Sequence, residues 1–362
     1  MENHVISVRQ FTIIVTFFAI GTGILIFPAS IVGESKQDAW MSSILAVLIS
    51  LLIVRMFIAT GNIAPNKSLV DINRRILGKW VGNFVSITFV FFTFMTAGEL
   101  LYFANDFLST SIMHDSSGYQ FSIIFGLLVI FGCSLGLETF ARSAEILFPI
   151  FFILFIILIL LISPQINVEN IQPVLENGPK SILFGALLFI SYFSFPMISL
   201  LMIFPVSIKD KKGAKKGFYI GTIVGGISLI IIITLCILVL DPNYTAHSRF
   251  PSYELAKLIS IGNVIERIEI ILGFMWFIAV FFKTLVYFYA SIIGLGQILK
   301  IKNYRILTLP LGFVLILLSK FIHPNTIHSD IYNKGPWIPF VATYAVILPL
   351  VLIIVAKIRK IN

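Results

Sequence analysis

The chain has 362 residues, of which 58% are hydrophobic and only 12% are charged, and its mean hydropathy is +1.00. Soluble domains carry about 25% charged residues, so this composition excludes a soluble protein and indicates an integral membrane protein. The net charge of +9 is explained by membrane topology and contact with anionic lipid, and it needs no nucleic acid partner.

Apolar runs of about 18 or more residues recur along the chain, whereas the short alternating segments of an outer-membrane barrel do not. Each run is long enough for a helix to cross the bilayer. We therefore predict an all-α integral membrane protein with ten transmembrane helices. The expected spans are residues 8–32, 39–61, 80–108, 120–137, 144–163, 181–207, 216–240, 264–298, 305–322 and 336–357.

Basic residues gather on one side of this topology. With a cytoplasmic N-terminus, most of the 26 Lys and Arg residues fall in cytoplasmic segments, chiefly 67–79, 209–216, 300–305 and 357–360. Cytoplasmic loops of membrane proteins carry such an excess. Both termini are therefore predicted to lie in the cytoplasm.

Two near-copies of one motif occur in the two halves, ILIFPAS at 24–30 and LMIFPVS at 201–207. Ten spans divide into five and five, so the first and sixth spans cross the bilayer in opposite senses, and chance becomes the weaker explanation of the match. We predict one transmembrane domain, 1–362, with inverted repeats at about 8–163 (helices 1–5) and 181–357 (helices 6–10), a LeuT-like fold.

Both of these spans contain helix-weakening residues. The first has Gly21, Thr22 and Gly23 near its middle and Pro28 beyond them, and the sixth has Tyr192-Phe193-Ser194-Phe195-Pro196. Glycine is a poor helix former, and proline frees a backbone carbonyl. Helix breaks are therefore expected at Pro28 and Pro196, and backbone groups freed at that depth must line a cavity or meet a ligand.

Several short strings occur in order along almost the whole chain. They are QF at 10–11 with GTGILIFP at 21–28, DAW at 38–40, LGKWVG at 77–82, ARSAEILFP at 141–149, IQPVLENG at 171–178, and ERIEIILGFMWF with FFK at 266–283. Together they resemble the B subunit of bacterial spore germinant receptors, a branch of the amino acid/polyamine/organocation transporter superfamily. The resemblance implies a ten-helix, five-plus-five inverted fold. It also implies action with a larger A subunit and a lipoprotein C subunit in the inner spore membrane, where small nutrients such as amino acids trigger germination.

The sequence departs from this family at one place. Many relatives carry a glycine followed shortly by an acidic residue at the break of the sixth span, but here the stretch is FSFPMIS, with no carboxylate. A cationic nutrient would lose a partner there. Aromatic lining by Tyr192, Phe193 and Phe195 instead favours apolar groups, unless these rings face lipid or neighbouring helices.

The predicted ligand site lies at the two breaks. A half-helix beginning after Gly23 presents free N–H groups to an anion such as an amino-acid carboxylate. We expect Gly21, Thr22 and Gly23 to bind the carboxylate end and Phe193, Ser194 and Phe195 to bind the rest of the ligand. Alternatively, the glycines only allow close helix packing, as expected for the glycines that repeat every fourth residue at 213, 217, 221 and 225.

Two ionisable residues within spans are candidates for gating or ion coupling. Lys283 is predicted near the midplane, where a charged side chain costs about 3 kcal/mol or more. It could stand where related folds bind sodium or accept a proton, or it could be a neutral buried lysine or half of an interhelical pair. Glu99 is expected in the outer third of the third span, lining a vestibule or bonding to a neighbouring helix.

Other chemistries fit poorly. His4, His114, His247, His323 and His328 are predicted in termini or loops, which leaves no intramembrane metal cluster or acyl-transfer site. No phosphate-binding loop motif occurs. Cys133 and Cys236 fall inside apolar runs and imply no disulfide. We therefore expect no enzyme, no metal and no cofactor.

Two functions remain open. One is a nutrient-sensing receptor subunit of the inner spore membrane or plasma membrane of a spore-forming bacterium, which passes a signal to its A and C partner subunits. The other is a proton-coupled amino-acid permease of the same fold. The resemblance favours the first.

Overall fold

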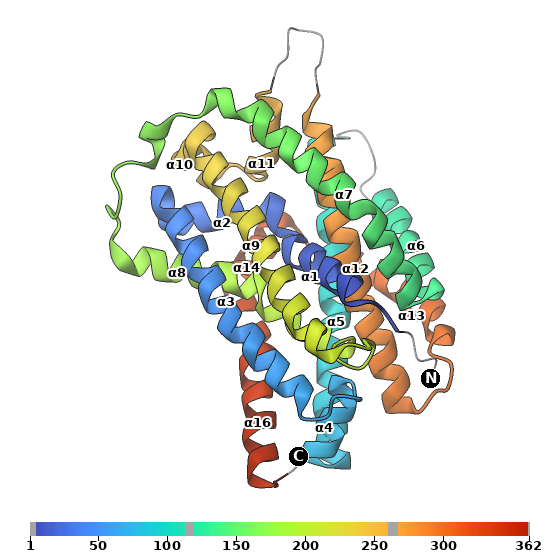
Figure 1. Ribbon diagram of the computed structural model, residues 1–362. Helices are drawn as coiled ribbons and strands as arrows, with labels where there is room; N and C mark the ends of the chain where they lie inside the picture. Colours follow the sequence, from blue (N-terminus) through green and yellow to red (C-terminus); the bar gives the residue numbers. More distant parts are fainter. Residues whose placement is uncertain (1–4, 113–118, 260–266, 361–362) are drawn as a thin grey trace.

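The computed structural model describes residues 5–112, 119–259 and 267–360, which form a helical bundle (Figure 1). The first half contains α1 (Val8–Ile20), α2 (Gly23–Ser35), α3 (Ala39–Asn62), α4 (Leu69–Leu77), α5 (Lys79–Phe107), α6 (Tyr119–Leu135) and α7 (Leu137–Ile162). The second half contains α8 (Gly178–Phe193), α9 (Lys211–Leu240), α10 (Pro242–His247), α11 (Pro251–Lys257), α12 (Glu269–Leu299), α13 (Arg305–Phe321), α14 (Thr326–Lys334), α15 (Trp337–Ala342) and α16 (Leu348–Ile358). Short 3₁₀ segments are η1 (Lys36–Asp38), η3 (Ser163–Gln165), η4 (Val168–Ile171) and η5 (Phe195–Met202), and π-helical turns are η2 (Leu108–Ile112) and η6 (Thr343–Ile347).

Membrane-spanning helices make up most of the bundle. In the described part of the chain, 7 helical segments are long and apolar enough to cross a membrane, or up to 8 if the bent pair α13 and α14 counts as one span. α1 and α6 are apolar but shorter, with 13 and 17 residues. The protein is thus a multi-pass membrane protein, while the count of ten spans and the inverted repeats at 8–163 and 181–357 stay predictions.

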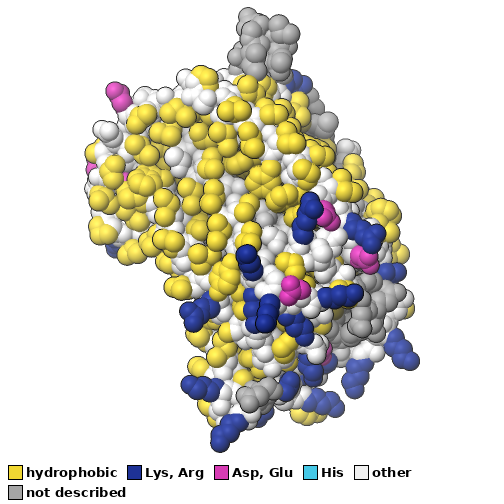
Figure 2. Space-filling view, in the orientation of Figure 1, with side chains coloured by type: hydrophobic (Ala, Val, Ile, Leu, Met, Phe, Trp, Pro, Cys, Tyr) yellow, Lys and Arg dark blue, Asp and Glu magenta, His cyan; other side chains and the backbone are white. Residues whose placement is uncertain are grey.

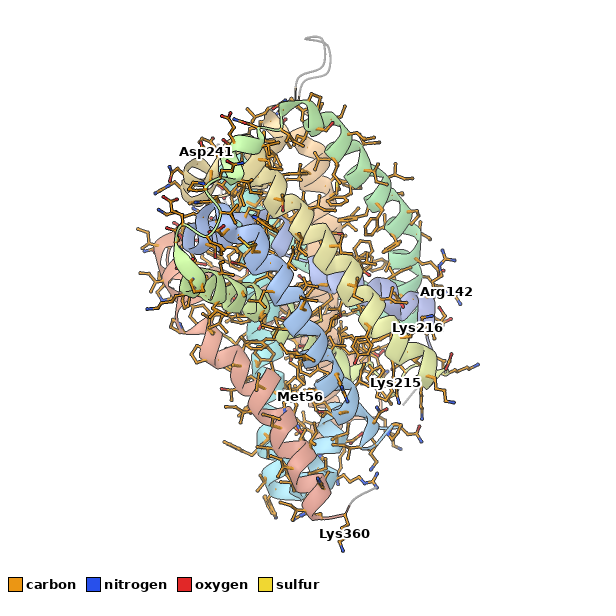
Figure 3. All side chains as sticks on the ribbon, turned by 60° about the vertical axis from the view of Figure 1, so that its left-hand side comes forward. Met56, Arg142, Lys215, Lys216, Asp241 and Lys360 are labelled. Carbon is orange, nitrogen blue, oxygen red and sulfur yellow. The ribbon has the colours of Figure 1, made fainter. Side chains whose placement is uncertain are left out.

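The molecular surface matches a lipid environment. Figure 2 shows apolar side chains over much of one face. Large apolar side chains exposed on the molecule include Leu52, Phe84 and Leu160. Lysine and arginine gather toward the lower end of that view. Figure 3 shows Lys215 and Lys216 near one end of α9 and Asp241 at the other, so the basic residues mark one end of the bundle, called here the basic end.

The first span is broken at Gly21 and Thr22. α1 begins with a capping box, in which the Ser7 side chain accepts from the Gln10 amide, and it ends at Ile20. Gly21 then has φ 33° and ψ −119°, which ends the helical hydrogen bonding, and α2 restarts at Gly23. A φ in this positive range favours glycine over every other residue.

Pro28, predicted as a helix break, lies inside α2 instead. Since proline has no N–H, it leaves the carbonyl of Ile24, four residues earlier, without its helical partner. The hydroxyl of Ser252 on α11 donates to that oxygen. α2 therefore continues through the proline because a side chain from another element satisfies the freed carbonyl.

The sixth span changes geometry close to the predicted place. α8 ends at Phe193, Ser194 has φ −99° and ψ −33°, and the chain continues as the 3₁₀ segment η5, with Pro196 in its first turn. The break thus lies at Ser194, two residues before Pro196, which is tolerated at a helix start because its N–H would be unpaired there.

The glycines of α9 form a packing face, as predicted. A methyl group added at Gly221 would lie 2.7 Å from the Thr12 carbonyl oxygen, and one at Gly225 would lie 2.6 Å from Ala19. Both contacts are with α1, so these glycines let the two backbones approach closely. α1 is thereby held against α9, which fixes the position of the Gly21 break.

Candidate functional site at the helix breaks

A cavity lies where the two helix breaks meet. Side chains from α2, α5, α8, α12, α14 and α15 surround it, together with residues of the breaks themselves. Its lining residues are Thr22, Ile26, Phe27, Thr96, Glu99, Leu100, Phe103, Tyr192, Pro196, Lys283, Tyr287, Asn333 and Trp337. Thr22, Glu99, Tyr192, Pro196 and Lys283 were all singled out from the sequence, so the structure brings these five together.

Lys283 reaches the break from α12. Its ammonium group donates to the carbonyl oxygen of Tyr192 at 3.2 Å and lies 5.4 Å from the centre of the Phe18 ring. The aliphatic part of the side chain crosses Gly21, where an added methyl group would collide with Lys283 Cδ. Gly21 is therefore needed both for its backbone conformation and for the passage of this lysine.

Glu99 faces the cavity from α5 and is buried. Its Oε1 lies 3.4 Å from Nε2 of His323, which is also buried. His323 follows α13 in a loop, as predicted, yet it packs against a transmembrane helix. His4 and His114 lie outside the described residues. The carboxyl group of Glu99 and the amine of Lys283 thus line the same cavity from two different helices.

Polar atoms complete the lining. The hydroxyl of Tyr287 is fully buried and has no hydrogen-bond partner among the described residues. The Tyr192 hydroxyl donates to the carbonyl of Asn333, and the Trp337 indole donates to the carbonyl of Ser191 at 3.2 Å. The rings of Tyr192 and Trp337 are stacked, with centroids 6.2 Å apart. A buried hydroxyl without a partner is costly and points to a missing one.

Other predicted site residues point away from the cavity. A methyl group at Gly23 would lie 3.0 Å from Leu229 of α9, so Gly23 is a packing position. The Phe193 ring packs against the Phe189 ring, with centroids 5.1 Å apart and the planes tilted by 57°. The Ser194 hydroxyl accepts from Ser50 on α3 at 2.9 Å.

Phe195, also predicted to contact the ligand, lines an apolar groove with Ile49, Ile53 and Ile190 instead. The physical reason is the helical rotation of about 100° per residue, which turns the side chains after Tyr192 toward α3 and α9. The residues of this break that face the cavity are therefore Tyr192 and Pro196.

The cavity is narrow. Its volume is about 30 Å³, close to the space that one water molecule occupies. Any ligand larger than water must therefore widen it on binding. With one amine and one carboxyl side chain at its wall, the cavity has the functional groups to hold a small molecule that carries both a carboxylate and an ammonium group.

Sequence reasoning missed Tyr287, Trp337, Asn333 and Thr96. Tyr287 lies four residues after Lys283 on α12, so helical spacing placed the two on one face and could have found it. Trp337 and Asn333 come from the segment after α13, where the chain bends by 99°. Hydropathy carries no signal for that bend.

Comparison with known families and structures agrees with this architecture. The family model described as "Spore germination protein" matches residues 5–327. Spore germination protein KB of Bacillus subtilis is 29% identical over 369 residues, covering 99% of this chain and 96% of the relative. Spore germination protein YndE of Bacillus subtilis is 24% identical, covering 98% and 97%, and GerLB of Bacillus cereus is 25% identical, covering 99% and 96%.

A solved structure shows the fold. Mhp1, a nucleobase-cation-symport-1 family transporter solved in a closed conformation with bromovinylhydantoin bound, aligns with a TM-score of 0.65 at 12% identity, covering 95% of this chain and 79% of Mhp1. Mhp1 has a LeuT-type fold, so the predicted fold class is confirmed. With a family model that matches most of its length and relatives that match nearly all of it, this chain belongs to the spore germination protein family.

Proposed function

We propose that this protein is the nutrient-sensing subunit of a spore germinant receptor and that it binds an amino acid in the cavity at the helix breaks. The observation that carries the proposal is that two buried ionisable side chains, Lys283 and Glu99, line the same cavity. Lys283 would hold the ligand carboxylate, assisted by the N-terminal end of α2 at Thr22, and Glu99 would hold the ammonium group.

The narrowness of the cavity supports a signalling role. A ligand that widens the space between α2, α5 and α12 binds a different arrangement of these helices more tightly than the closed one, and so shifts the population toward it. In this proposal the A and C receptor subunits detect that shift. The protein would act in the inner spore membrane, with both termini in the cytoplasm.

A proton-coupled amino-acid permease is the second candidate, and the likeness to the transporter Mhp1 favours it. The same cavity would then open to each side of the membrane in turn. Amino-acid uptake by the purified protein in sealed vesicles would support the permease. Ligand binding without uptake would support the receptor.

A germination assay tests the proposal. In spores whose other germinant receptors are deleted, removing this gene should abolish the response to at least one of a panel of amino acids. Lys283→Met should abolish the same response, whereas Lys212→Met, an exposed lysine at the basic end, should leave it unchanged. A normal response in Lys283→Met would remove this lysine from the site.

A further inference from the structure

Two histidines connect the molecular surface to the cavity. α13 begins at Arg305 near the basic end, and His323 follows its other end, about 25 Å away along the helix. The chain then bends by 99° into α14. His328 in α14 is exposed, whereas His323 and Glu99 are only 4% and 5% exposed.

The three side chains form one hydrogen-bonded series. Nδ1 of His323 lies 3.0 Å from Nδ1 of His328, and Nε2 of His323 lies 3.4 Å from Oε1 of Glu99. The Asn325 side chain accepts from the backbone N–H of His328 at 2.8 Å and so fixes the first turn of α14. The bend between α13 and α14 therefore brings the two rings together.

The geometry also restricts which nitrogen can carry each proton. Two Nδ1 atoms at 3.0 Å need one hydrogen between them, because two would repel and none would leave two lone pairs in contact. If neutral His323 donates from Nε2 to the Glu99 carboxylate, its Nδ1 must accept from His328 Nδ1–H. These tautomers are assigned from the hydrogen-bond network.

Glu99 lies between two cavities. Glu99, Thr96 and Trp337 line the cavity at the helix breaks. The same three residues also line a second cavity of about 120 Å³, whose wall includes His323 and His328. Titratable and charged groups around this series come from several helices. They are Tyr102 of α5, Tyr119 of α6, Tyr192 of α8, Lys283 and Tyr287 of α12, Lys320 of α13, and Asp330 and Tyr332 of α14.

We propose that His328, His323 and Glu99 form a proton-uptake path from the surface to the ligand cavity. A proton binds Nε2 of His328, the proton on its Nδ1 passes to Nδ1 of His323, and the proton on Nε2 of His323 passes to Glu99. Both histidines end neutral, and the Glu99 carboxylate becomes a neutral carboxylic acid. The return of that proton by the same route restores the starting tautomers.

Proton uptake at Glu99 regulates the site. It removes the negative charge at the cavity wall while Lys283 remains, so a protonated Glu99 no longer attracts a ligand ammonium group. This consequence depends on the proposed function, whereas the proton path itself does not. External acid is therefore expected to weaken the binding of a zwitterion.

Infrared spectroscopy of the full chain in lipid nanodiscs tests the path without any ligand. The protonated-carboxyl band of Glu99 is assigned by its loss in Glu99→Gln, and its rise is followed after a jump to acid pH. His323→Gln and His328→Gln should each slow that rise by about tenfold or more. His247→Gln, a histidine of α10 bonded to its own helix, should match the wild type.

An unchanged rate in both His323→Gln and His328→Gln would overturn the proposal. Because His328 is exposed, its variant tests the path even if His323→Gln does not fold. A second measurement uses glycine as the zwitterion and records its apparent affinity at several pH values. Absence of glycine binding at every pH would count against the proposed ligand class and would leave the infrared result intact.

Discussion

At the scale of single residues, Tyr287 offers the cleanest test of the cavity. Its hydroxyl has no partner among the described residues, so Tyr287→Phe removes no protein hydrogen bond and should leave the unfolding temperature unchanged or raise it. Affinity for an amino acid that triggers germination should fall by up to about tenfold, since one ligand hydrogen bond of about 1 kcal/mol is lost. Calorimetric titration measures the affinity, and an unchanged value would exclude contact between Tyr287 and the ligand.

Gly21 is the residue on which the break depends. Gly21→Ala places a side chain at φ 33° and against Lys283, which should cost about 1–3 kcal/mol and displace the lysine. Thermal unfolding of the purified protein should show the loss. Gly33→Ala is the matched control, because Gly33 lies in α2 with no atom within 4 Å of an added methyl group. Equal unfolding temperatures for the two variants would contradict the strained conformation at Gly21.

Whether a cavity-lining residue could be predicted from the sequence depended on the chemistry of its side chain. Lys283 and Glu99 were found because ionisable side chains at membrane depth are rare. Phe193 and Phe195 could not be separated from Tyr192, because all three are aromatic and only the orientation of α8 and η5 decides which one faces the cavity.

At the scale of elements, the contact between α11 and α2 depends on a proline and a serine. Ser252→Ala leaves the Ile24 carbonyl buried without a donor, which should cost about 1–3 kcal/mol. Pro28→Ala supplies a backbone N–H that can bond to the same carbonyl. The double variant should therefore lose less stability than the sum of the two single variants. Thermal unfolding of all three measures this, and simple additivity would show that the hydroxyl does not replace the missing helical bond.

Long elements were predicted better than short ones. The expected span 39–61 is observed as α3, Ala39–Asn62, and 305–322 as α13, Arg305–Phe321. The span expected at 144–163 begins earlier, at Leu137, and the start of the one expected at 264–298 lies outside the described residues. α4 and α14 were missed because a helix of 9 residues with polar side chains leaves no hydropathy signal. Ser68, which caps α4, was a usable local signal.

At the scale of the whole molecule, composition and the order of apolar runs were sufficient to predict the fold class. Inside the bilayer no water is present, so the backbone N–H and C=O groups must form their hydrogen bonds within helices. Composition and hydropathy could not predict where the cavity lies. Its walls come from helices far apart in the sequence, and their rotation is set by packing such as that of Gly221 and Gly225 against α1. The near-copies at 24–30 and 201–207 located the two broken spans, whereas the breaks themselves lie upstream, at Gly21 and Ser194.

Membrane orientation is a property of the whole molecule, and α9 allows it to be measured. Lys216 and Asn243 lie near opposite ends of this helix and are both exposed, while the native Cys133 and Cys236 are free but buried. If the basic end faces the cytoplasm, a membrane-impermeant maleimide should label Asn243→Cys in intact cells and label Lys216→Cys only after the cells are opened. The wild-type protein, with its two buried cysteines, is the control for background labelling. The reverse pattern would invert the molecule in the membrane, and proton uptake through His328 would then start from the cytoplasm.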